Sequence, residues 1–192
     1  NEKFLADALA KSAIIEKGGE QIGLIGLTPQ DTNELSSPGP QVTFSDPTAA
    51  VQSEVDKLTR MGVNKIIVLS HSGYGVDIKV AAQTTGVDII VGGHTNTYLS
   101  NISDRAEGPY PTMVGSTAIV SAYAYGKFLG ELNVTFNDAG EVVSATGEPL
   151  IMDAAVTEDS ATVTRIAEAA KPLEQIRKLV VAQANTEIVG VR

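Results

Sequence analysis

The only two histidines of the chain each follow a largely apolar run that is typical of a buried strand. His71 follows residues 66–70, and His94 follows residues 87–93. Ligands of open α/β sheets bind outside the carboxyl ends of the strands, and neighbouring strands lie about 4.8 Å apart. We therefore expect the two imidazoles to lie close enough to share one metal ion.

Small residues and a side-chain amide accompany these histidines. Gly73 lies two residues after His71, and Gly92 and Gly93 precede His94. Glycine permits a sharp exit from a strand and keeps side-chain bulk out of a site. The amide oxygen of Asn96 could bind the same ion, so the predicted metal ligands are His71, His94 and Asn96. The simpler alternatives are polar residues at loop mouths for the histidines and a turn residue for Asn96.

Other catalytic schemes fit the sequence less well. Ser70 and Ser72 flank His71, but neighbouring residues of a strand point to opposite faces, so neither forms a natural serine–histidine pair. The absence of cysteine excludes disulfides, thiolate zinc sites and a cysteine nucleophile. Asp46 and Asp77 are interpreted as helix caps.

The elements around the histidines predict an α/β fold. The apolar runs 65–70 and 86–93 are joined through a helix at 77–85, which favours parallel strands covered by helices. A second helix is expected to begin after Ser45 or Asp46 and to stop at Gly62. A hairpin precedes it, and further strands, which either finish this sheet or start a second one, follow Asn96. The expected strands outside the two apolar runs are 13–16, 21–27, 42–44, 112–114, 117–123, 129–136, 142–144 and 150–151.

Composition limits the classes of partner. Of the 192 residues, 43% are hydrophobic and 19% are charged, as in folded domains. The formal charge of −9, without any block of lysine or arginine, excludes a footprint for a nucleic-acid backbone. No apolar stretch approaches the roughly 20 residues that span a bilayer.

Two ordered segments carry a family resemblance, residues 66–73 (IIVLSHSG) and 86–97 (GVDIIVGGHTNT). They resemble the two downstream metal motifs of the 5′-nucleotidase family, within the calcineurin-like metallophosphoesterases. The resemblance extends from about Gly18 to Asp159 through GLT with DT, SPG, VDKL and AYAYGKFLG.

The resemblance implies a fold and an activity. The fold would be part of a metallophosphoesterase-like β-sandwich flanked by helices. Two divalent metal ions, zinc, manganese, cobalt, magnesium or calcium, would activate water for attack on the phosphate of a nucleotide. By position, His71 and His94 would be metal ligands, and Asn96 matches an amide at or beside a metal. The parent protein would be exported, to the periplasm, the cell surface or the exterior.

Several motifs of the family are missing from this sequence. An Asp-x-His, a Gly-Asp and a Gly-Asn-His-Glu motif would supply the bridging aspartate, other ligands and the catalytic histidine, and none occurs here. We therefore expect residues 1–157 to be the C-terminal part of the metallophosphoesterase domain, and 158–192 to form a long linker helix and the start of the next domain. The chain alone should bind metal weakly or not at all, and should be inactive.

Two other functions stay open. The chain could be a non-catalytic α/β binding or interaction module, whose truncated sheet edge pairs with a second copy. Alternatively, a phosphoesterase for cyclic nucleotides or nucleotide sugars would share the metal chemistry and differ only in the domain that recognises the substrate.

Overall fold

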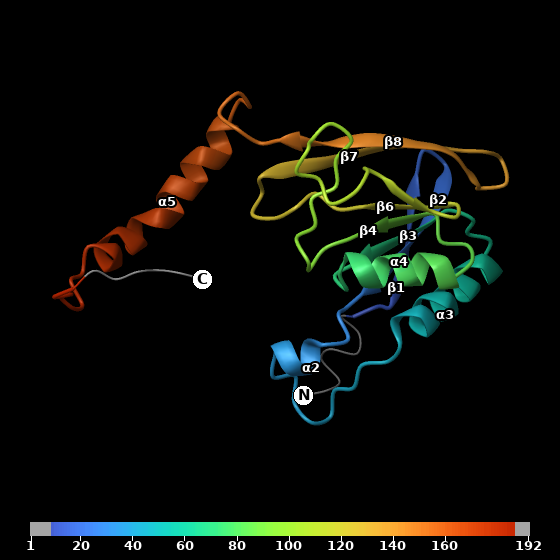
Figure 1. The fold of residues 1–192 in the computed structure, drawn as a ribbon, viewed down its shortest axis with the longest axis horizontal. Coiled ribbons are helices and arrows are strands. Elements are labelled where there is room, and N and C mark those ends of the chain that lie inside the picture. The colour runs from blue at the N-terminus through green and yellow to red at the C-terminus, as the bar shows by residue number, and fades with distance from the viewer. Residues whose placement is uncertain (1–8, 187–192) are drawn as a thin grey trace. The chain divides into compact units, whose positions relative to one another are not determined.

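A computed structural model describes residues 9–186 of the chain. The chain divides into two units, Asn1–Met152 and Asp153–Arg192. Among the described residues, the first unit contains all the strands and the second contains one long helix (Figure 1).

The main sheet of the first unit has six strands in the order β1-β2-β3-β4-β6-β5. The four central strands β2, β3, β4 and β6 run parallel, whereas β1 and β5 are antiparallel edge strands. The strands are β1 (Ser12–Lys17), β2 (Glu20–Leu27), β3 (Ile66–Ser70), β4 (Ile89–Val91), β5 (Thr112–Val114) and β6 (Thr117–Val120). The expected parallel sheet is confirmed.

Helices α3 (Pro47–Arg60) and α4 (Tyr74–Gln83) cover one face of this sheet (Figure 1). Asp46 caps α3 by accepting a hydrogen bond from the backbone N–H of Ala49 at 2.9 Å, as the sequence predicted. The main core lies between the helices and the sheet. Its fully buried members include Ile25, Val51, Leu58, Ile66, Val68, Val80, Ile90 and Ile119.

A two-stranded hairpin forms the opposite layer. Strands β7 (Phe128–Phe136) and β8 (Val142–Ile151) pair antiparallel and lie across the other side of the main sheet (Figure 1). Leu132 of β7 packs against the second core, which Leu99, Tyr110 and Val120 form. The first unit is therefore a two-sheet sandwich with helices on the outer face of one sheet, and the predicted fold class is confirmed.

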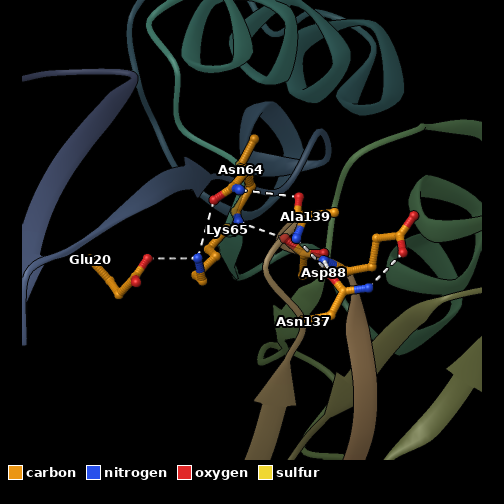
Figure 2. Close-up of polar contacts among 8 residues, drawn as sticks. Glu20, Asn64, Lys65, Asp88, Asn137 and Ala139 are labelled. Atoms are coloured by element: carbon orange, nitrogen blue, oxygen red, sulfur yellow. Dashed lines mark hydrogen bonds and ion pairs between the residues drawn. The ribbon is translucent and has the colours of Figure 1, made fainter.

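The tip of the hairpin reaches the amino ends of the central strands, which we call the amino edge. There the side chain of Asn64 donates a hydrogen bond to the backbone oxygen of Ala139 at 3.1 Å (Figure 2). The ammonium of Lys65 donates to Glu20 at 2.8 Å. A carboxylate oxygen of Asp88 accepts from the backbone N–H of Ile66 at 2.7 Å. Polar contacts thus close this end of the sandwich.

The second unit contains α5 (Ser160–Arg177). Asp159 caps it by accepting from the backbone N–H of Thr162 at 2.7 Å, and none of the helix residues is buried. Over residues 9–186, no helix is long and apolar enough to cross a membrane.

Several expected elements differ from the structure, among them the expected strand 117–123, which ends at Val120. Residues 42–44 form no strand and pair with no strand of the main sheet. Helix α4 begins at Tyr74, three residues before the predicted start, because Gly73 is its N-terminal cap. Residues 142–151 form one strand, since the whole segment pairs with β7. The last part of the expected start of a next domain, residues 187–192, lies outside the described residues.

Candidate metal centre

His71 and His94 lie side by side at the carboxyl ends of β3 and β4. Their ring centroids are 5.3 Å apart, and the rings meet edge to face at 64°. The two strands are adjacent and parallel, with Leu69 opposite Val91, so each histidine leaves its strand at the same edge of the sheet. The close approach expected from the sequence is confirmed. We call this end of the central strands the carboxyl edge.

The turn after β4 has an unusual backbone. His94 and Asn96 have positive φ angles of 75° and 54°. This left-handed region is uncommon for residues other than glycine, although asparagine and histidine adopt it more often than most, and it costs on the order of 1–3 kcal/mol. Such strain is kept mainly where a side chain must point in one particular direction. The turn therefore fixes His94 and Asn96 at some cost in stability.

Glycines let the two turns interlock. A Cβ at Gly93 would lie 3.0 Å from Nδ1 of His71. In the other direction, a Cβ at Gly73 would lie 2.8 Å from the methyl group of Thr95. Thr95 also accepts a hydrogen bond from the backbone N–H of Tyr74 at 3.1 Å. The backbone of each turn thus packs against a side chain of the other, which holds the imidazoles together.

The predicted ligands can be reached from solvent. His71 and Asn96 are exposed, and the side chain of His94 is 26% exposed. Asp31, on the loop after β2, lies close by, with 3.6 Å between its Oδ2 and Nε2 of His94. Asp31 is not among the metal ligands predicted from the sequence. The sequence signal that could have found Asp31 is its position soon after the carboxyl end of β2, which pairs with β3.

Asp77 is not a helix cap, contrary to the sequence interpretation. It lies inside α4, its side chain is 0% exposed, and its Oδ1 accepts a hydrogen bond from the hydroxyl of Ser70 at 2.5 Å. Burial raises the pKa of the Asp77 carboxyl, and the hydrogen bond from Ser70 opposes this shift. The signal that could have found it is helical spacing, because Asp77 shares a face with the buried Val80 and Ala81.

The side chains at the carboxyl edge include donors of kinds that can bind metal ions. Imidazoles suit zinc, copper, iron and nickel, and a carbonyl-type oxygen suits harder cations such as magnesium, calcium and manganese. Among residues 9–186, no group of three or more histidine, cysteine or acidic side chains is arranged to hold an ion. Within the described part of the chain, the carboxyl edge therefore brings two imidazoles together without a surrounding set of carboxylates.

Known proteins similar to this chain are 5′-nucleotidases. No family model matches the chain. A snake venom 5′-nucleotidase of Naja atra is 46% identical over 162 residues, which are 80% of this chain and 31% of that protein. The 5′-nucleotidase of Diplobatis ommata is 40% identical over 93% of this chain and 32% of its own length. The chain thus spans about a third of the length of these relatives.

Solved structures agree with the sequence matches. The 5′-nucleotidase precursor of Thermus thermophilus superposes with a TM-score of 0.87 at 41% identity, covering 97% of this chain and 39% of that one. A calcineurin-like phosphoesterase of Bacillus subtilis shares the fold, with a TM-score of 0.68 at 23% identity, covering 87% of this chain and 59% of that one. The chain belongs to the 5′-nucleotidase family, and its fold is that of the calcineurin-like phosphoesterases.

Proposed function

We propose that this chain supplies the histidine side of a two-metal site in a 5′-nucleotidase, which hydrolyses nucleotide phosphomonoesters. The observation that carries the proposal is the distance of 5.3 Å between the rings of His71 and His94, at the carboxyl ends of adjacent parallel strands. Two converging imidazoles are suitable ligands for a divalent transition metal. The identity of 46% to an enzyme named a 5′-nucleotidase supports the reaction class.

Each predicted ligand has a distinct role in this proposal. Divalent cations, when bound, neutralise the phosphate and activate water for attack on it. His71 and His94 hold a cation through ring nitrogens, and Asn96 adds its amide oxygen. Because His71 and Asn96 are exposed, the phosphate of a nucleotide can approach this edge from solvent.

We assign residues 1–157 to the C-terminal part of the metallophosphoesterase domain, and 158–192 to a linker helix and the start of a following domain. The chain alone should bind metal weakly and turn over little or no substrate, because the described residues bring no third histidine or carboxylate group into a metal-holding arrangement. We also propose that the parent protein is exported, which the match to a snake venom protein supports.

A zinc titration of the whole chain tests this function. We expect the ring signals of both histidines to shift together in heteronuclear NMR spectra, and Asn96→Ala to weaken the response. Asn133→Ala is the matched control, since Asn133 is also an exposed asparagine but lies on β7. A phosphatase assay with a nucleoside monophosphate and manganese should give little or no turnover.

The opposite outcome favours the non-catalytic alternative. If neither histidine responds to zinc or manganese, the chain is a binding or interaction module. Its two edge strands, β1 and β5, would then be the candidates for pairing with another copy. Robust turnover by the chain alone would contradict only its inactivity in isolation.

A further inference from the structure

The geometry points to Asp77 as a positioning residue that fixes the spacing between His71 and His94. Its carboxyl group lies beneath the carboxyl edge and contacts the ends of both histidine-bearing strands. This inference rests on the proposed function for its importance to metal binding, but its geometric part concerns the metal-free protein.

The first oxygen of Asp77 holds the end of β3. Oδ1 accepts the hydrogen bond of the Ser70 hydroxyl at 2.5 Å, and Ser70 is the last residue of that strand. The Ser70 hydroxyl oxygen in turn accepts the backbone N–H of Ser72 at 3.1 Å. Both neighbours of His71 are therefore tied into one hydrogen-bonded chain that ends at Asp77.

The second oxygen of Asp77 faces the end of β4. A Cβ at Gly92 would lie only 2.6 Å from Oδ2 of Asp77, so α4 approaches the backbone there as closely as a glycine allows. Gly92 donates its N–H to the backbone oxygen of Val120 at 2.8 Å, which fixes it within the sheet. Gly92 lies two residues before His94. The carboxyl group thus sets the distance between α4 and this second turn.

Asp77 lowers the stability of the fold, which argues against a purely stabilising role. Oδ2 is buried and has no hydrogen-bond partner among the described residues. An unpartnered buried oxygen of a carboxyl group destabilises a fold by roughly 1–3 kcal/mol or more. An apolar residue would suit the face that Asp77 shares with Val80 and Ala81. Asp77 is therefore explained better by what it contacts than by what it contributes to the core.

Variants of the whole chain test this role in two ways. In the metal-free protein, we expect a nuclear Overhauser effect between the two imidazole rings, which Asp77→Ala should weaken or abolish. In a zinc titration, Asp77→Ala should lower the affinity at least tenfold. Asp77→Asn should stay within about threefold of wild type, because its amide oxygen still accepts from Ser70.

Asp88→Asn is the matched control, because Asp88 is another carboxylate with little solvent exposure that contacts the same pair of strands at the amino edge. It should change neither the ring contact nor zinc affinity. If Asp77→Ala does not fold, Ser70→Ala replaces it, with an expected three- to tenfold loss of affinity and a weaker ring contact.

The outcomes separate this inference from the proposed function. An unchanged ring contact in the folded Asp77→Ala protein, or in Ser70→Ala if the former does not fold, overturns the positioning role whether or not zinc binds. If the wild-type protein does not respond to zinc but Asp77→Ala still loses the contact between the rings, the positioning role of Asp77 stands and the proposed metal site is refuted. Rescue by Asp77→Asn distinguishes positioning from a simple requirement for negative charge.

Discussion

An aspartate with restricted solvent access lies at the amino edge of strands β3 and β4, and another lies at their carboxyl edge. The surroundings of the two aspartates differ. At the amino edge, Asp88 accepts a backbone hydrogen bond, and the tip of the β7–β8 hairpin lies nearby (Figure 2). At the carboxyl edge, Asp77 keeps one buried oxygen that finds no hydrogen-bond partner within residues 9–186, beneath two solvent-accessible histidines. The polar groups named at the amino edge are hydrogen-bonded, whereas the carboxyl edge retains a buried polar atom that lowers the stability of the fold.

The glycines show the same contrast. Gly140 at the amino edge lets the hairpin tip pack against Asn64, since a Cβ there would lie 2.3 Å from the backbone oxygen of that residue. At the carboxyl edge, Gly73 and Gly93 bring side chains of the two turns together. Close packing joins two layers at one edge and arranges potential ligands at the other. We infer that the amino edge serves stability and the carboxyl edge serves binding.

The strongest test of this contrast removes a histidine. His94→Ala should lower zinc affinity by about 100-fold or more, because one ligand of a partial site is lost, and should leave the free energy of unfolding within about 1 kcal/mol. Isothermal titration calorimetry and urea unfolding measure the two effects. A large loss of stability without a loss of affinity would place His94 with the structural residues of the other edge.

A methyl group at Gly92 should have the next largest effect. Gly92→Ala places a Cβ 2.6 Å from the Asp77 carboxyl oxygen, and we expect a loss of about 1–3 kcal/mol in unfolding free energy. Gly26→Ala on strand β2 of the same sheet is the matched control, because nothing lies within 4 Å of its Cβ position. If the clash with Asp77 causes the loss, then adding Asp77→Ala should recover part of it in a double-mutant cycle.

Asp88 should make stability depend on pH. Burial raises the pKa of Asp88 to about 6 from its ordinary 3.8, so the folded state binds the proton more tightly than the unfolded state. Its contribution to stability should therefore fall as pH rises from about 4 to about 6, by roughly 1–2 kcal/mol after allowance for solvent screening.

Unfolding of wild type and Asp88→Asn across this pH range measures the effect as the difference between the two curves. Asp138→Asn is the control, because it removes an exposed negative charge from the tip of the β7–β8 hairpin. Parallel curves for wild type and Asp88→Asn would contradict the raised pKa.

The smallest effect should come from the contact between layers. Asn64→Ala removes the hydrogen bond to Ala139, and we expect a loss of about 0.5–1.5 kcal/mol in unfolding free energy. Zinc affinity should stay unchanged, because the contact lies at the amino edge. Thermal unfolding and the zinc titration together check this pair of outcomes, and a change in affinity would mean that the two edges are coupled.

The carboxyl edge was more predictable from sequence than the amino edge. His71 and His94 could be placed because each ends a continuous apolar run, and parallel strands bring such ends together. Asp77 was misassigned because an aspartate near the start of a helix usually caps it, and only its spacing from Val80 and Ala81 indicated burial. The pairing of Asn64 with Ala139 joins residues 75 positions apart, and no local pattern encodes it.

The second layer shows a similar limit. Alternation in residues 129–136 predicts a strand, but not whether it joins the main sheet or starts another. The choice depends on which strand edges are free, which only the assembled topology decides. Here β7 pairs with β8 alone and lies across the main sheet (Figure 1).

The interlocked turns have a consequence for protein engineering. Because Gly93 lies against His71 and Gly73 lies against Thr95, neither turn keeps its shape without the other, although they are about 20 residues apart in the chain. Grafting one histidine loop onto a foreign scaffold should therefore fail to reproduce the pair. A successful transplant would have to carry both loops, their strands and the intervening helix as a single module.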